Sequence, residues 1–291
     1  MPHINSFILM SDARNFSNEQ PINPYYTPES IDCDAAAAEH SALRDLLSES
    51  GINITSIPAP AGCQDGVYTA NWALVRGHTA VLASLPNARK NEEKYAEKVL
   101  TSLGKKVVHV PKGLKFSGQG DALACGNLLF CGSGYRSDAR AQKFAAKTLK
   151  YELIQLQTVP QIDKDGNPII NIASGWPDSY FYDIDLALAI IKAPTKDKKG
   201  LIAYCPDAFT PKSRKILSEL DLVDKIEVDI NEAKNGFATN LISTGETVIM
   251  SAHAPKLTQD LRSHGLTVVT PEIKELAKGG GYIRCMTLTI N

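Results

Sequence analysis

The sequence predicts a single α/β domain, residues 1–291, in which five similar modules close into a ring: a five-module α/β propeller with approximate five-fold symmetry. Three observations predict this fold. About three strand-like runs accompany each helical stretch, the order strand, strand, helix, strand recurs, and the first module lacks a strand that the C-terminal run can supply. A doubly wound fold would alternate one strand with one helix, so that class is disfavoured.

Amphipathic stretches predict one helix for each module, at residues 35–50, 91–103, 138–150, 211–220 and 255–264. Three of these stretches are followed directly by a glycine, namely Gly51, Gly104 and Gly265. Glycine takes the left-handed position after a helix at the least steric cost, so we expect these helices to end there.

The strands follow a regular order around these helices. One β-like run comes after each helix, at 54–57, 106–110, 152–159, 225–228 and 266–269. Two runs precede each of four helices, as in 68–75 with 79–85 and 237–242 with 247–251. Only Phe7–Met10 precedes the first helix, so we expect Tyr282–Ile290 to complete that module and close the ring.

The composition favours a small-molecule partner. The net charge is -1 and no long run of like charges occurs, which argues against nucleic acid or a membrane surface as a partner. The longest apolar runs, such as Leu186–Ile191, are far shorter than the roughly 18 residues of a membrane span. We therefore expect a cytoplasmic protein, and we leave a homodimer open. The six cysteines form no CxxC pair, so we expect reduced thiols and neither disulfides nor a metal site.

The segment AKGGGYIRCMTLTIN places Gly279, Gly280 and Gly281 just before a predicted strand that carries Cys285. Glycines allow the backbone to approach a ligand closely. By composition alone, however, a free cysteine is more often a small buried apolar residue than a nucleophile.

Several ordered motifs change that balance. They are INPYY near the start, GCQDGVYTAN (62–71), FSGQGDAL (116–123), GSGYRSD (132–138), FYDIDLALA (181–189) and KGGGYIRCMTL (278–288). Together they resemble the guanidino-group modifying (pentein) superfamily of amidinotransferases, arginine deiminases and dimethylarginine dimethylaminohydrolases. The members of this superfamily are five-module propellers. The forms of the first three motifs look most like the bacterial branch that hydrolyses citrulline and arginine.

The resemblance implies roles for individual residues. Cys285 takes the position of the nucleophile and Asp121 that of the buried acid of the glycine-rich motif. Asp65, Asn71 and Asp185 take positions that face the guanidinium. The remaining residues that the resemblance places at the substrate are Asn23, Ser117, Arg136 and Gly281. For Arg136, an exposed position in a loop is as good an interpretation as a position at the substrate. For Arg89, the exposed loop position is the better interpretation.

Two positions depart from the family pattern. Asp183 stands where the family has its acid/base histidine, and Ser117 stands where a glutamate usually opens the glycine-rich motif. An aspartate near its ordinary pKa of about 3.9 is a poor acid at neutral pH. Altered chemistry with Asp183 as the base, an inactive relative, or an introduced change all remain open. Among the histidines, only His253 merits a test as a substitute base.

The chemistry of the resemblance is the hydrolysis of a guanidino or ureido amino acid. Carboxylates hold the planar cation, a thiolate attacks its central carbon, and water hydrolyses the covalent intermediate, without a cofactor. An amidinotransferase and a non-catalytic propeller that binds an arginine-like ligand are the alternatives. The segment from Gln161 to Pro177, rich in Asp, Asn, Gly and Pro, is our expectation for a loop that closes the site.

Overall fold

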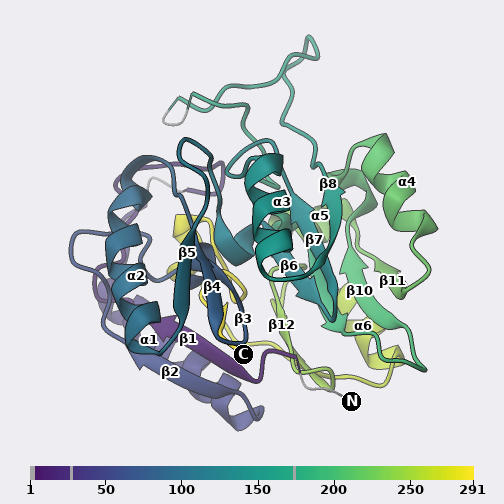
Figure 1. Ribbon diagram of the computed structural model, residues 1–291, viewed down its shortest axis with the longest axis horizontal. Coiled ribbons are helices and arrows are strands. Elements are labelled where there is room, and N and C mark those ends of the chain that lie inside the picture. The colour runs from purple at the N-terminus through teal and green to yellow at the C-terminus, as the bar shows by residue number, and fades with distance from the viewer. Residues whose placement is uncertain (1–3, 27–28, 173–174) are drawn as a thin grey trace.

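The computed structural model describes residues 4–26, 29–172 and 175–291 (Figure 1). Its strands form five three-stranded sheets, in the orders β15-β1-β2, β3-β4-β5, β6-β7-β8, β9-β10-β11 and β12-β13-β14. In each sheet the first pair is antiparallel and the second pair is parallel. The ring of five strand, strand, helix, strand modules is therefore confirmed.

The two ends of the chain share the first sheet, as predicted. β1 (Phe7–Ser11) pairs in parallel with β2 (Asn53–Ile57) and antiparallel with β15 (Leu288–Thr289). The other strands are β3 (Ala73–Arg76), β4 (Thr79–Leu82), β5 (Lys106–His109), β6 (Ala122–Cys125), β7 (Leu128–Gly132), β8 (Glu152–Leu156), β9 (Leu188–Lys192), β10 (Gly200–Tyr204), β11 (Val223–Glu227), β12 (Ile242–Ser243), β13 (Thr247–Ile249) and β14 (Thr267–Val269).

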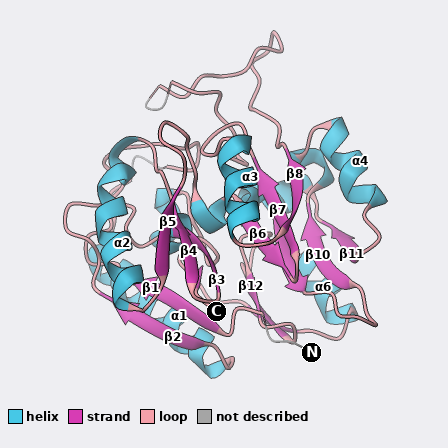
Figure 2. Cartoon of the chain, viewed as in Figure 1, coloured by secondary structure: helices cyan, strands magenta, loops and turns pink. Residues whose placement is uncertain are grey.

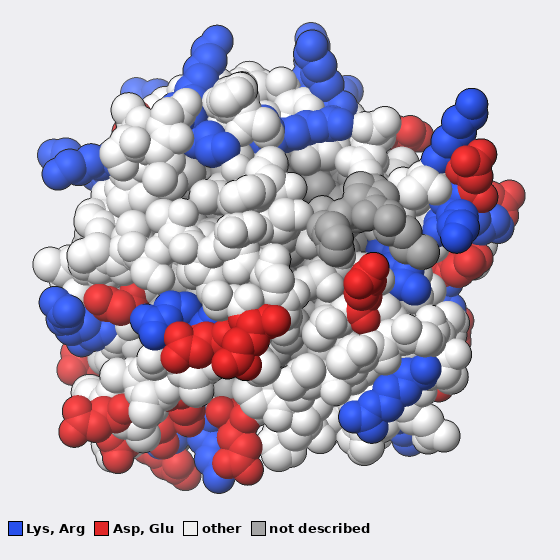
Figure 3. Space-filling view, turned by 90° about the horizontal axis from the view of Figure 1, so that it is seen from below, with Lys and Arg blue, Asp and Glu red and all other residues white. Residues whose placement is uncertain are grey.

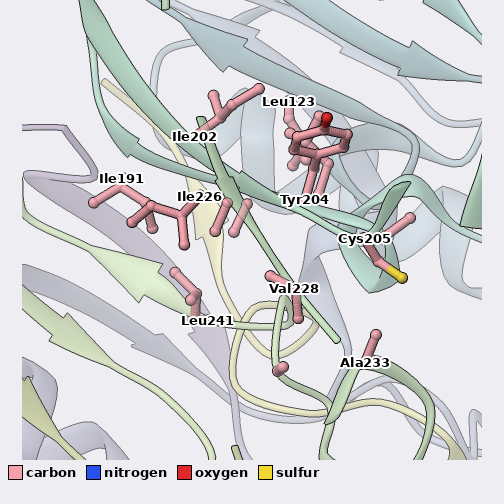
Figure 4. Close-up of a cluster of buried hydrophobic side chains, with 14 of the residues drawn as sticks. Leu123, Ile191, Ile202, Tyr204, Cys205, Ile226, Val228, Ala233 and Leu241 are labelled. Carbon is pink, nitrogen blue, oxygen red and sulfur yellow. The ribbon is translucent and has the colours of Figure 1, made fainter. Parts of the chain in front are cut away.

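The helices lie mainly around the outside of the sheets (Figure 2). They are α1 (Cys33–Glu49), α2 (Glu93–Ser102), α3 (Ala139–Thr148), α4 (Pro211–Glu219), α5 (Ile230–Gly236) and α6 (Pro255–Ser263). Side-chain caps define three of their starts: Asp32 accepts from the Ala35 amide, Thr210 from the Ser213 amide and Asp229 from the Asn231 amide. Apolar side chains fill the space between modules, as around Ile202, Ile226 and Leu241 (Figure 4).

This topology gives the ring two different faces. Within each module a short turn joins the inner strand (β15, β3, β6, β9 or β12) to its antiparallel neighbour, except in the first module, where the inner strand comes from the other end of the chain. The connections between modules are longer, and each ends at the start of an inner strand: 58–72, 110–121, 157–187, 228–241 and 270–287. We call the side of these connections the front and the opposite side the rear.

Three local predictions were wrong. Cys285 lies not in a strand but in a turn, where the Met286 amide donates to the Tyr282 carbonyl and the Thr287 amide to that of Arg284. Residues 68–75 begin with the 3-10 helix η1 (Thr69–Trp72), so β3 starts only at Ala73. The expected strand 237–242 is limited at its start by α5, which we did not predict and which ends at the left-handed Phe237 (φ 50°).

The surface carries both charges. Figure 3 shows one face on which a broad uncharged area is bordered by charged residues, with basic and acidic side chains next to each other at several places. Within the described part of the chain, none of the helices is both long enough and apolar enough to cross a membrane.

Candidate active site

The five long connections bring polar residues to the front end of the inner strands. Asn71 precedes β3, Asp121 precedes β6, Asp185 precedes β9, Asn240 precedes β12 and Cys285 precedes β15. Each side chain is at most 3% exposed, so the five modules jointly enclose one polar site. Four of these five residues were predicted; Asn240 was missed, and its signal was its position just before a strand, as for Asn71.

Cys285 contacts one acid and one amide. Its Sγ lies 3.4 Å from Asp185 Oδ2 and accepts from Asn240 Nδ2 at 3.2 Å. The Asn240 side chain also accepts from the Cys285 amide at 3.2 Å, so it holds the cysteine at both ends. Burial and the neighbouring Asp185 raise the pKa of the Cys285 thiol well above its ordinary value. The thiol is therefore protonated at neutral pH until something changes its surroundings.

Asp183, the residue at the position of the family histidine, is paired rather than free. Its Oδ2 accepts from Asn71 Nδ2 at 2.7 Å and lies 3.3 Å from Arg136 Nη1. The Arg136 guanidinium also lies over the Tyr182 ring, 4.1 Å from its centroid. Burial is the largest single influence on the pKa of Arg136 and lowers it, but Asp183, Tyr182 and Asp65 together offset it and the net shift is upward. Arg136 is thus a buried partner of Asp183, and its interpretation as a solvated loop residue was wrong.

Three carboxylate oxygens of the site lack a partner. Among the described residues, neither Asp121 Oδ2, Asp183 Oδ1 nor Asp185 Oδ1 has a hydrogen bond, although all three are buried. Buried polar atoms are nearly always paired, and an unpaired carboxylate oxygen is costly. These oxygens therefore leave room for the donors of a bound ligand.

Burial changes the protonation of these acids. It is the largest cause that raises the pKa of Asp185 to about 8, with the charge of Asp183 as the next, while Arg284 acts in the opposite direction. Burial followed by Asp183 raises the pKa of Asp121 well above its ordinary value. The pKa of Asp65 is raised to about 6, again by burial first.

Asp65 and Arg89 form a second polar group beside this one. Tyr26 Oη donates to Asp65 Oδ1 at 2.6 Å. The Arg89 guanidinium donates to both carboxylate oxygens of Glu92, at 2.9 and 2.8 Å, and to Asn71 Oδ1 at 2.6 Å. Arg89 is only 3% exposed, so the expectation of a solvated loop residue was wrong here too. Its bonds are those of a structural arginine that orients Asn71.

The remaining predicted residues frame the site. The Ser117 hydroxyl accepts from Asn71 Nδ2 at 2.8 Å. Asn23 Nδ2 donates to the Gly279 carbonyl at 3.2 Å, which ties the first polar segment to the last. A side chain at Gly281 would overlap the Tyr68 ring, whose hydroxyl donates to Leu276. The glycines before Cys285 therefore permit close packing of this segment.

The described conformation encloses the site. Cys285 is 3% exposed, and Tyr26 covers Asp65 from the segment that also carries Asn23. A cavity of about 240 Å³ reaches Asp65 and Arg89 from outside. The segment Gln161–Pro177, which we expected to close the site, projects from the front, with residues 173–174 outside the described part (Figure 1). Its role as a lid remains a prediction.

His253 is exposed in the turn between β13 and α6, where its amide donates to the Ser251 hydroxyl. It offers no contact to the acids around Cys285 among the hydrogen bonds of the described residues, so it is not a substitute for the family histidine. Over the same residues, no group of three or more His, Cys, Asp or Glu side chains is arranged to hold a metal ion.

Comparison with known proteins points in one direction. The family described as N,N dimethylarginine dimethylhydrolase, eukaryotic, matches residues 10–291. The N(G),N(G)-dimethylarginine dimethylaminohydrolase of Mycobacterium tuberculosis is 30% identical over 288 residues, which cover 97% of this chain and 85% of that protein.

A second relative is longer. The bifunctional arginine dihydrolase/ornithine cyclodeaminase AgrE of a Nostoc species is 28% identical, and the match covers 97% of this chain but only 37% of AgrE. A crystal structure of an AgrE variant with L-arginine superposes with a TM-score of 0.84 at 27% identity, over 98% of this chain and 40% of that one. The chain thus spans a little over a third of the length of this relative.

Proposed function

Because the chain belongs to the N,N-dimethylarginine dimethylhydrolase family, we propose that it hydrolyses a guanidino or ureido amino acid of the arginine, methylarginine or citrulline type through a covalent bond to Cys285. One observation carries the proposal. Among the described residues, Asp121, Asp183 and Asp185 each have a buried carboxylate oxygen without a partner, and Asp185 contacts the buried thiol of Cys285. A guanidinium supplies the in-plane N–H donors that such oxygens lack.

The charge of the site favours a cation. Arg89 is matched by Glu92, and Arg136 by Asp183. Asp65, Asp121 and Asp185 then lie in the same site with Arg284 as a nearby cation. Burial is the main cause of their raised pKa values, and the charge of Asp183 adds to it at Asp121 and Asp185. A guanidinium that enters would lower those pKa values, and that of Cys285, by direct attraction. Substrate binding is therefore expected to release protons and to help ionise the nucleophile.

Asp185, rather than Asp183, is the proton acceptor that we propose. Asp183 Oδ2 is already engaged, because it accepts from Asn71 Nδ2 and lies beside Arg136 Nη1. Asp185 contacts Cys285 Sγ at 3.4 Å, and its pKa near 8 suits proton exchange at neutral pH. Asp183 then neutralises Arg136 and supplies one oxygen to the substrate.

The reaction follows from these contacts. Asp185 takes the thiol proton and Sγ forms a bond to the central guanidinium carbon. The C–N bond to the leaving nitrogen breaks as Asp185 returns the proton, so that ammonia or an amine departs. Asp185 then takes one proton from water as the water oxygen bonds to the same carbon. The other proton of that water passes to sulfur as the C–S bond breaks, which restores the thiol and releases the ureido product. Asp185 finally gives its proton to solvent. Asn240, which donates to Sγ, supports the thiolate in both stages.

The test is intact mass spectrometry of the protein after incubation with arginine, N-methylated arginines, agmatine and citrulline, alongside assays for ureido groups, ammonia and amines. We expect turnover of at least one compound and a transient adduct on Cys285. The Cys285→Ser variant should bind the same compound without turnover. If no compound is turned over, no adduct forms and the variant binds all compounds as the wild type does, the proposal is wrong. Transfer of the amidino group to an added amine in place of water would identify an amidinotransferase.

A further inference from the structure

A second cavity lies at the rear end of the inner strands. It has a volume of about 240 Å³, and residues from all five modules line it, including Val75 of β3, Ala124 of β6, Ile190 of β9 and Thr289 of β15. Leu241, just before β12, completes the ring. In each module a residue of the catalytic site precedes the inner strand, and a residue within that strand or directly before it lines this cavity.

Arg284 is the cation of this rear cavity. Its guanidinium donates to three neutral oxygens: the carbonyl and hydroxyl of Thr287, at 2.6 and 3.1 Å, and the Gln119 amide oxygen at 2.8 Å. Arg284 is 8% exposed and has no carboxylate partner within the described part of the chain. Arginine has five N–H donors, so these bonds leave donors over. The acid that acts on Arg284, Asp185, belongs to the catalytic site, and no Asp or Glu among the described residues lines the rear cavity, so an anion bound there would meet the charge of Arg284 directly.

Thr239 gives a second and independent sign of a ligand. This residue is 1% exposed and lines the same cavity, and its Oγ1 has no hydrogen-bond partner among the described residues. Buried side-chain hydroxyls usually have a hydrogen-bond partner, so this one needs an explanation. Two other polar side chains of the cavity are engaged: Asn5 bonds Ser243 and Thr289, and Gln119 bonds Arg284 and Thr289.

The wall of the cavity is partly polar and partly apolar. Val75, Leu123, Leu188, Ile190 and Leu241 form its apolar part, and a hydrated inorganic ion would leave that part without a partner. We propose that the rear cavity binds a small aliphatic carboxylate, with its carboxylate at Arg284 and Thr239 and its chain against these apolar side chains.

The rear cavity is coupled to the catalytic site through Arg284, which directly precedes Cys285. The positive charge of Arg284 favours the ionised forms of Asp185 and Cys285. A carboxylate beside Arg284 weakens that effect, so it is expected to slow turnover without competing with substrate. This consequence rests on the proposed function, whereas binding itself does not.

Binding is tested by titrating the protein, residues 1–291, with valerate, butyrate, acetate and chloride. Isothermal titration calorimetry and the NMR shifts of the Thr239 and Leu241 amides measure the binding. We expect saturable valerate binding that tightens about fourfold for each added methylene. Chloride should bind most weakly. Absence of saturable binding, or equal binding of chloride and valerate, would overturn the proposal.

Two variants, one control variant and one chemical treatment test whether the carboxylate binds in the rear cavity. Thr239→Val keeps the side-chain shape but removes the hydroxyl, and should weaken valerate binding about tenfold. Ala124→Phe, on an exposed position of β6, should block the cavity mouth and abolish binding. Thr267→Val, on the exposed face of β14, is the matched control and should change nothing. Alkylation of Cys285 should leave valerate binding intact; its loss would place the carboxylate in the catalytic site instead.

Discussion

The front and rear ends of the same five inner strands differ in chemistry because the segments that connect the strands differ in length at the two ends. At the rear, short turns join antiparallel neighbours, and the described lining of the cavity there combines apolar and neutral polar residues with one buried cation, Arg284. At the front, connections such as 157–187 and 270–287 are long enough to turn side chains toward the axis, and they deliver a thiol and several acids. Symmetry of the scaffold therefore does not imply symmetry of charge.

The strongest test of this contrast replaces Asp185 by asparagine. The variant keeps the shape of the side chain but removes the proposed proton acceptor, so kcat should fall by about 10²–10⁴-fold, the usual range for loss of a general base. Steady-state kinetics on the best substrate measures the change. Asp197→Asn, in the exposed rear turn after β9, is the control and should be silent. Equal activity of the Asp185 variant and wild type would exclude Asp185 as the base.

Asp183→His introduces the histidine that the family has at this position. It tests whether the catalytic site at the front depends on the ion pair between Asp183 and Arg136. Removal of the acid leaves Arg136 as an unpaired buried cation, so we expect a loss of about 3–5 kcal/mol in the free energy of unfolding, with lower activity. Urea denaturation measures the loss. Asp183→Asn retains an oxygen for Arg136 and should cost less. A gain in both turnover rate and free energy of unfolding would instead show that Asp183 impairs the protein relative to the histidine of the family.

The fold was readable from the sequence because it depends on repetition. Glycine after a helix, and three strand-like runs per helix, are local signals that survive errors in any one element. The site was only partly readable. The motif positions gave Cys285, Asp65 and Asp121, but whether Asp183 or Asp185 serves Cys285 depends on the distance from Sγ, which sequence does not contain. The ion pair between Arg136 and Asp183 joins two modules, so it too depends on distances that the sequence does not contain.

The pH dependence separates the front acids from the rest of the protein. The folded-state pKa of Asp185, about 8, lies above the ordinary value of 3.8, so the folded state binds more protons and stability falls as pH rises through this window. The same titration should make kcat/KM rise with pH up to about 8, because the ionised form is the base. Denaturation and kinetics from pH 5 to 9 measure both trends. In Asp185→Asn the stability trend should be smaller; an unchanged trend would assign it to another group.

The smallest expected effect concerns glycines at the two ends. Gly245, in the rear turn between β12 and β13, has φ 96° and open space around its Cα, so Gly245→Ala should cost about 1 kcal/mol through backbone strain alone. That corresponds to about 2–4 °C in Tm by scanning calorimetry, with kcat unchanged. Gly281→Ala is the matched substitution at the front. Gly281 lies four residues before Cys285, and the added methyl group would overlap the Tyr68 ring. It should lower kcat as well as Tm. If both variants lose only stability, the packing of the front glycines does not position Cys285, and the two ends differ in charge alone.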